Sequence, residues 1–187
     1  ISIALLMVFG GCMFTTACGK KDKNVIELNE VTHSIFYAPL YVAINNGYFK
    51  DEGLTVKLTN GGGSDTSMSA LLTGSADIIL AGPETVVYTQ QEGIKDKPVV
   101  FGQLTQCDGS FIVSKEAKPD FTLADLVGET IIGGRNGGLP AMTLQYIIQS
   151  NGYQIGTGAD KINLRTDVAF NLTASVWDGD SSIKYCT

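Results

Sequence analysis

Hydrophobic and polar positions along the first half of the chain repeat one unit, in which a short strand-like run leads through a corner into a helix. Residues 25–32, 54–59 and 76–81 are the three runs, and apolar residues at helical spacing follow each of them. Units of this kind in series predict a parallel sheet with three helix N-termini along one edge. The third run is apolar almost throughout, which predicts an interior strand.

The corners hold the residues best placed to contact a ligand, because ligands of open α/β sheets bind at the carboxyl ends of the strands. The first corner contains the only histidine, His33, two aromatic residues and Pro39, which suits the first turn of a helix. The second corner is a run of three glycines at 61–63, after which Ser64 or Asp65 can cap the next helix.

Two further corners extend this set. The third is Gly82-Pro83-Glu84-Thr85, where Glu84 either faces a ligand or only decorates a helix N-terminus. The fourth, at 134–138, contains Arg135, whose guanidinium can bind an anion in a bidentate way beside backbone N–H donors. The two glycine-rich corners are those at 61–63 and 134–138, and neither has the spacing of a dinucleotide fingerprint or a P-loop.

The second half of the chain continues the alternation of strands and helices up to about residue 165. Thr122 and Asp125 have the spacing of a capping box. The last ten residues, 178–187, have neither a strand nor a helix pattern. The predicted elements are strands at 99–104 (buried), 110–114, 130–133 and 162–164, and a helix at 140–152.

Three segments carry a family resemblance: HSIFYAP at 33–39, GYFKDEGL at 47–54 and GSADI at 74–78. In this order they resemble ABC-transporter substrate-binding proteins of the nitrate/sulfonate/taurine type. The pyrimidine-binding proteins of thiamine salvage (NMT1/THI5-like) belong to the same family. The resemblance covers residues 25 to about 174.

The resemblance implies an α/β fold of the periplasmic-binding-protein-like two-lobe kind (type II). Lobe 1 would comprise residues 25–106 and lobe 2 residues 107–187, with a hinge near 104–109. Family members continue with a strand and a return crossover into lobe 1. Because residues 178–187 do not match that pattern, we expect the C-terminal part of the fold to be missing and lobe 1 to be incomplete.

The N-terminal residues predict export and a lipid anchor. Residues 1–17 are uncharged and mostly apolar or small, as in the hydrophobic region of a signal peptide. Cys18 then resembles a bacterial lipoprotein processing site, although Thr15 replaces the usual Leu, and residues 18–24 form a polar tether. Cys12 is a weaker alternative site, and a core helix with an incidental cysteine is the other interpretation. We expect a protein anchored to the outer face of the cytoplasmic membrane, or a periplasmic one.

Composition excludes several functional classes. The formal net charge of -6 argues against nucleic acid as a partner. Cysteine and histidine spacing predicts no metal site, leaves Cys107 and Cys186 as free thiols, and suggests no cofactor. One histidine cannot assemble a Ser/His/Asp triad without partners that converge in space.

These observations favour a non-enzymatic protein that captures a small solute and delivers it to an ABC permease. The alternative is an enzyme on the same scaffold, similar to the thiamine-pyrimidine synthases or the menaquinone-pathway enzymes, although the cysteine-rich motif of those synthases does not occur here. The expected solute carries an anionic or strongly polar group.

Most of the candidate site residues also have a purely structural interpretation. His33 could equally be a packed, satisfied side chain, and Phe36, Tyr37 and Tyr41 could be core, which we favour for Tyr41. By resemblance, Phe170 and Asn171 lie near the cleft between the lobes. The expected ligand-binding residues are His33, Phe36, Tyr37, Gly62, Gly63, Ser64, Gly82, Pro83, Glu84, Ser110, Arg135, Asn136, Gly137 and Asn171.

Overall fold

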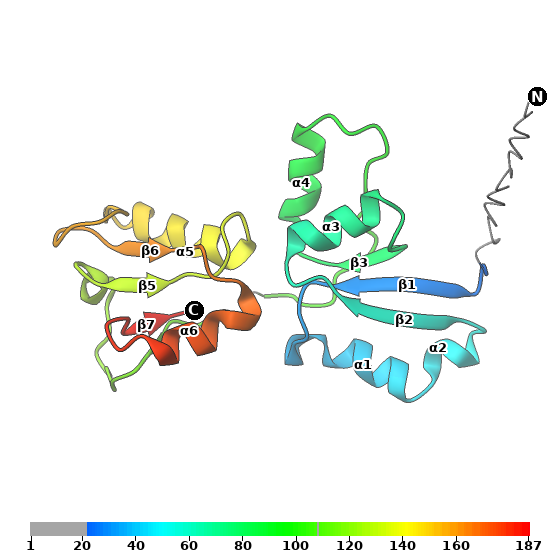
Figure 1. Cartoon of the computed structure of the whole chain (residues 1–187), viewed down its shortest axis with the longest axis horizontal. Helices are drawn as coiled ribbons and strands as arrows, with labels where there is room; N and C mark the ends of the chain where they lie inside the picture. Colours follow the sequence, from blue (N-terminus) through cyan, green and yellow to red (C-terminus); the bar gives the residue numbers. More distant parts are fainter. Residues whose placement is uncertain (1–21, 108) are drawn as a thin grey trace, which may run out of the picture.

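The computed structural model describes residues 22–107 and 109–187, which form two lobes with one β-sheet each. Figure 1 shows the two sheets arranged end to end, with β1 and β2 of lobe 1 pointing toward β5 and β6 of lobe 2. The carboxyl ends of strands from both lobes therefore face the junction. The predicted signal peptide at 1–17 and the predicted lipidation site at Cys18 lie outside the described residues.

Lobe 1 is a three-stranded parallel sheet in the order β2-β1-β3, with Leu28 of the central strand opposite Leu58 and Ile78. Helices α1 and α2 lie on one side of this sheet in Figure 1, and α3 and α4 on the other. The three predicted strand–corner–helix units are present. The elements are β1 (Val25–Glu30), η1 (Ile35–Tyr37), α1 (Ala38–Asn45), α2 (Tyr48–Asp51), β2 (Thr55–Asn60), α3 (Ser64–Leu72), β3 (Ile78–Leu80) and α4 (Glu84–Gln91).

Lobe 2 has a four-stranded sheet in the order β4-β7-β5-β6, in which β5 pairs in parallel with both neighbours and β4 runs antiparallel to β7. The predicted strand at 130–133 and helix at 140–152 form within about two residues of their expected bounds. The elements are β4 (Val113–Ser114), η2 (Leu123–Leu126), β5 (Thr130–Ile132), α5 (Leu139–Ser150), β6 (Asn163–Arg165), η3 (Phe170–Leu172), α6 (Thr173–Gly179) and β7 (Tyr185–Cys186).

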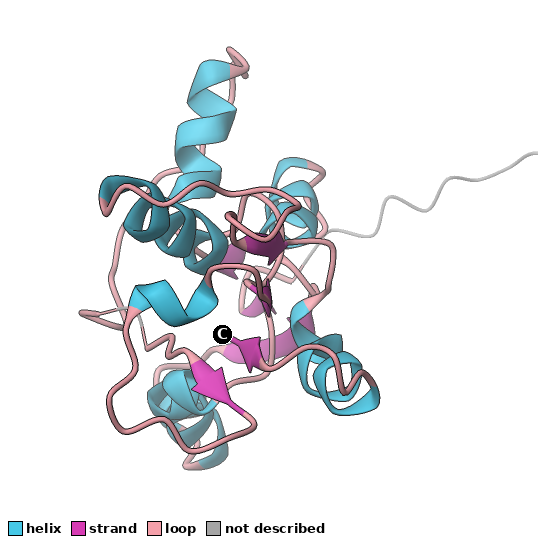
Figure 2. Ribbon diagram, turned by 90° about the vertical axis from the view of Figure 1, so that its left-hand side faces the viewer, coloured by secondary structure: helices cyan, strands magenta, loops and turns pink. Residues whose placement is uncertain are grey.

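The apolar core is concentrated in lobe 2. Figure 2, viewed from the lobe-2 end, shows strands at the centre and helices around them. Both clusters of buried apolar side chains among the described residues belong to this lobe, one built on Leu126, Ile131, Leu144, Ile148, Ile162 and Tyr185, the other on Ile132, Val168, Ile183 and Cys186. In lobe 1, helices α1 and α2 bury no residue fully.

The C-terminal segment corrects the expectation that residues 178–187 have no regular structure. Tyr185 and Cys186 form β7, which lies between β4 and β5 in the lobe-2 sheet. Ile183 and Tyr185 are each only 2% exposed. The physical reason is tertiary: two residues suffice for a strand when neighbours on both sides satisfy its backbone groups. Cys186 is a buried free thiol and Cys107 an exposed one, as expected.

The region after α4 corrects two other expectations. Residues 99–104 form no strand, and Val99 and Phe101 are 81% and 78% exposed. The strand β3, predicted to be interior, pairs only with β1 and ends the sheet. The two outcomes have the same cause. Among the described residues, no strand pairs with the outer edge of β3, and none pairs with residues 99–104.

Of the two predicted helix caps, one is confirmed and one is wrong. The carboxylate of Asp125 accepts a hydrogen bond from the backbone N–H of Thr122 at 2.8 Å, which confirms the predicted capping-box contact at the start of η2. At α3 the prediction of a Ser64 or Asp65 cap is wrong, since Gly63 occupies the N-cap position and makes no side-chain cap. Asp65 instead pairs with a residue of lobe 2, described below.

No described helix is long and apolar enough to cross a membrane.

Candidate functional site

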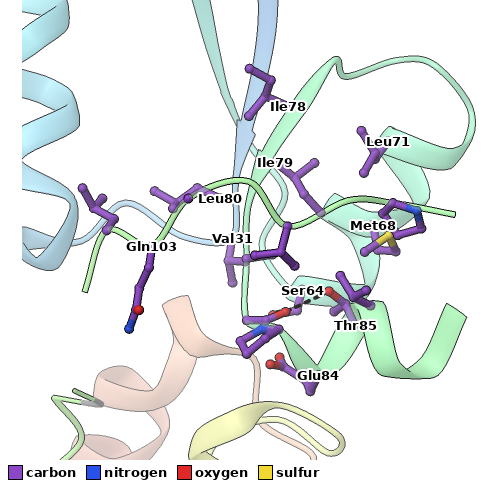
Figure 3. Close-up of a pocket in the computed structure, with 18 of the residues that line it drawn as sticks. Val31, Ser64, Met68, Leu71, Ile78, Ile79, Leu80, Glu84, Thr85 and Gln103 are labelled. Carbon is purple, nitrogen blue, oxygen red and sulfur yellow. Dashed lines mark hydrogen bonds between the residues drawn. The ribbon is translucent and has the colours of Figure 1, made fainter. Parts of the chain in front are cut away.

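A hollow of about 1960 Å³ lies at the carboxyl ends of the lobe-1 strands and reaches lobe 2. One part of its wall is apolar and runs between β3 and residues 98–104. The other part is formed by the first and third corners, with residues 138–140 and Phe170 of lobe 2 also lining the hollow. Figure 3 shows the lobe-1 side, where Ile79, Val31 and Thr85 come from different elements but line the same space.

The corner after β1 is organised by a buried carboxylate. Glu30 is 2% exposed, and its two oxygens lie 3.0 Å from His33 Nδ1 and 2.6 Å from the Tyr41 hydroxyl, which donates to it. The imidazole of His33 stacks on the ring of Tyr41, with centroids 4.4 Å apart. Burial, and then the hydrogen bond to Glu30, raises the pKa of Tyr41. His33 thus has a fixed orientation while its side chain stays 72% exposed.

The corner after β3 contains a second buried carboxylate, that of Glu84, which is 7% exposed. A Cβ on Gly82 would lie 1.9 Å from Glu84 Oε2, so the carboxylate folds over Gly82 and only a glycine leaves room for it. The hydroxyl of Thr85 closes the corner by donating to Gly82 O at 2.8 Å, the dashed line in Figure 3.

Tyr37 lies in the field of both carboxylates. Burial raises the pKa of its phenol, and the negative charges of Glu30 and Glu84 raise that pKa further. The hydroxyl therefore keeps its proton at neutral pH and offers the hollow a hydrogen-bond donor. Phe36, which is 52% exposed, lines the same wall. This wall thus combines aromatic faces with negative charge.

The two lobes touch beside this hollow, at the second and fourth corners. Arg135 Nη2 lies 2.6 Å from Asp65 Oδ2, and a Cβ on Gly63 would lie 2.8 Å from Arg135 Nη1. The Tyr88 hydroxyl donates to Gly137 O at 2.9 Å and also lies 2.9 Å from Met142 Sδ. A smaller hollow of about 260 Å³ lies here. Arg135 is therefore engaged by Asp65 of the opposite lobe.

The predicted site residues separate into three groups. Gly62 and Asn171 line neither hollow, and the Gly62 N–H is bound to Asn60 Oδ1 at 2.8 Å. Gly63, Arg135, Asn136 and Gly137 line the smaller hollow, and Ser64 lines both. The larger hollow brings together His33, Phe36, Tyr37, Gly82, Pro83, Glu84 and Ser110.

Sequence reasoning did not single out Glu30 or Tyr88 as candidate site residues, whereas Phe170, which the resemblance placed near the cleft, lines both hollows. Glu30 could have been found as an acidic residue at the carboxyl end of a strand, next to a corner, a position that burial makes costly unless partners are present. The role of Tyr88 had no local signal, because its partners Gly137 and Met142 are about fifty residues away in sequence. Within the described residues, no group of three or more His, Cys, Asp or Glu side chains could hold a metal ion.

Two lobes with facing strand ends and a hollow at their junction form a periplasmic-binding-protein-like fold. Structural relatives of the chain share that fold. A lipoprotein of Bacillus subtilis named for methionine binding superposes with a TM-score of 0.55 at 21% identity over 88% of this chain and 69% of its own. A protein from Bordetella bronchiseptica RB50 gives the same TM-score and identity over 88% of this chain and 50% of its own. The predicted periplasmic-binding-protein-like fold is confirmed.

The chain belongs to the NMT1/THI5-like family, whose model matches residues 35–180. YtlA of Bacillus subtilis (strain 168), named as a binding protein, is 43% identical over 141 residues, which are 74% of this chain and 42% of YtlA. The formylaminopyrimidine-binding protein of Halalkalibacterium halodurans is 29% identical over 186 residues, 96% of this chain and 52% of that protein. The chain thus spans about half the length of these relatives or less, and the predicted family resemblance is confirmed.

Proposed function

We propose that this protein is the solute-binding component of an ABC importer, and that it captures a small solute between its lobes and delivers it to the permease. The observation that carries this proposal is the hollow at the facing strand ends, which is lined by corners of lobe 1 and by residues 138–140 and Phe170 of lobe 2. Closure of two lobes over a ligand is the usual mode of periplasmic binding proteins.

The names of the curated relatives support the same proposal. Both curated relatives are named as binding proteins, one of them for a formylaminopyrimidine. We propose that lobes of residues 25–106 and 107–187 close about a hinge near 104–109. The predicted lipid on Cys18 would anchor the protein to the outer face of the cytoplasmic membrane, next to the permease.

The test is a thermal-shift panel of nitrate, taurine, an alkylsulfonate, aminopyrimidines and riboflavin. A ligand present at one hundred times its dissociation constant adds about 2.7 kcal/mol of apparent stability. Any compound that raises the melting temperature is then measured by calorimetry on two variants, Tyr37→Ala in lobe 1 and Phe170→Ala in lobe 2.

Weaker binding in both variants supports capture between the lobes, because each variant removes a side chain from one wall of the hollow. The matched control is Tyr48→Ala, since Tyr48 is 55% exposed on α2 and lines neither hollow. A compound that binds the Phe170→Ala variant as well as the parent would place the site on lobe 1 alone. No shift with any compound would count against solute binding.

A further inference from the structure

Two side-chain contacts join the lobes at the smaller hollow. In the first, the guanidinium of Arg135 on lobe 2 lies 2.6 Å from the carboxylate of Asp65 on lobe 1. In the second, the hydroxyl of Tyr88 on lobe 1 donates to the backbone oxygen of Gly137 on lobe 2 at 2.9 Å. Both contacts meet the same corner of lobe 2. In Figure 1 the helices nearest to them, α3, α4 and α5, lie on the same side of the two sheets.

The lobe-2 half of these contacts is held in place by backbone hydrogen bonds. The N–H of Asn136 donates to Thr166 O at 2.8 Å, and the N–H of Gly138 donates to Arg135 O at 3.0 Å. On the lobe-1 side, a Cβ on Gly63 would lie 2.8 Å from Arg135 Nη1, so the backbone of lobe 1 approaches the guanidinium closely. The corner of lobe 2 is therefore a fixed surface against which lobe 1 can close.

The strength of these contacts suits an arrangement that can open. The side chains of Asp65 and Arg135 are 63% and 38% exposed. An ion pair of this kind favours the joined lobes by about 2- to 5-fold, and a hydrogen bond such as that of Tyr88 by about 2- to 10-fold. Together they bias the lobes toward the joined arrangement by roughly 10-fold, which shifts the populations without locking them.

We propose that Asp65, Tyr88, Arg135 and Gly137 form a latch that holds the two lobes together before a solute arrives. Opening the latch lets the lobes part about the hinge near 104–109 and admits the solute, and closing it again retains the solute. Salt weakens the latch, because both charged partners are exposed. This inference rests on the proposed solute-binding function, and it assigns Arg135 to the contact between the lobes in place of the expected contact with an anionic solute.

The test measures the distance between the lobes in the absence of solute. Gln91 at the exposed end of α4 and Tyr146, which is 72% exposed on α5, are replaced by a ketone-bearing amino acid that carries a spin label. This labelling leaves the native cysteines unchanged. Double electron–electron resonance then gives the distribution of distances between the labels, and the parent at low salt shows mainly the distance of the joined lobes.

Three changes weaken the latch in different ways. Arg135→Gln removes the ion pair, Tyr88→Phe removes the hydroxyl, and about 0.5 M sodium chloride screens the charges. Each raises the ratio of parted to joined molecules by about 2- to 10-fold, and salt has no further effect on Arg135→Gln. Exchange of the two charges, Asp65→Arg with Arg135→Asp, returns the distribution to that of the parent. The matched control Lys57→Gln removes an exposed ion pair within lobe 1 and leaves the distances unchanged.

A solute found in the thermal-shift panel supplies a second measurement. Arg135→Gln weakens its apparent affinity by about 2- to 5-fold, because a smaller fraction of the molecules is in the binding-competent arrangement. The charge exchange at Asp65 and Arg135 restores that affinity if the pair acts by joining the lobes. Affinity that stays weak after the exchange means that Arg135 contacts the solute directly, and it overturns the retention of solute by the latch.

Failure of the latch and failure of the proposed function are distinguishable. Equal distance distributions in the parent, Arg135→Gln and Tyr88→Phe overturn the latch whether or not a solute binds, and so does a parent whose lobes are mainly parted at low salt. If no compound in the panel binds, the proposed function is overturned, while the distances measured without solute still decide whether the latch exists.

Discussion

The burial of the C-terminal segment predicts that Ile183→Ala destabilises lobe 2. Ile183 is 2% exposed and belongs to the cluster of Ile132, Val168 and Cys186, against which Trp177 packs. The substitution removes about three buried carbons at ~0.8 kcal/mol each and leaves a cavity. The free energy of unfolding of lobe 2 should therefore fall by about 2–5 kcal/mol.

The assay is urea unfolding followed by the fluorescence of Trp177, the only tryptophan in the chain. With a denaturant slope of about 2 kcal/mol/M, the expected midpoint shift is about 1–2.5 M. Ile35→Ala makes the same chemical change at a position 84% exposed and should stay within about 0.5 kcal/mol of the parent. If Ile183→Ala and the parent unfold at the same midpoint, residues 183–186 do not form the core strand and its surroundings described above.

Three other predictions concern ionisable groups. Asp65→Asn should cost less than about 1 kcal/mol in urea unfolding, because both partners of the Asp65–Arg135 pair are well exposed; a larger loss would mean that the pair is desolvated. The pKa of Asp125 is lowered by its hydrogen bond to Lys118 and then by the Thr122 N–H, so its contribution is present above the unfolded pKa and lost as pH falls through the lower folded one. Stability should thus drop below about pH 4, less steeply in Asp125→Asn, and equal slopes would contradict this account. In ultraviolet titration, Tyr37→Phe should remove a phenol that ionises above about pH 10, and loss of one ionising below that pH would refute the raised pKa.

The sequence predicted those parts of the fold that local patterns determine. The strand–corner–helix units of lobe 1 and the Thr122–Asp125 contact depend on neighbours in sequence, and they formed as expected. The edge position of β3 and the exposed segment at 99–104 depend on which strands pair, and no local pattern carries that information. The short strand Tyr185–Cys186 was missed for the same reason, although apolar Ile183 and Tyr185 alternate with polar Lys184.

The candidate site could likewise be predicted only where local patterns determine it. The corners could be located, because strand ends and glycines mark them, and eight of the predicted residues line the larger hollow together. The charge relations could not be predicted. The meeting of Arg135 with Asp65 depends on how two distant segments pack. The contacts of Glu30 with His33 and Tyr41 lie within one corner, but they depend on how that corner folds, which the residue pattern does not specify.

Among the described residues, no strand pairs with the outer edge of β3. A strand edge with unpaired backbone groups is a template for association with another chain, and here it borders the same hollow as the corners. Two copies that met along Ile78–Leu80 would cover part of the hollow with their own backbone. Self-association would then compete with solute, so apparent affinities would weaken as protein concentration rises. Dilution series would therefore belong in every titration, with the intrinsic affinity taken at the dilute limit.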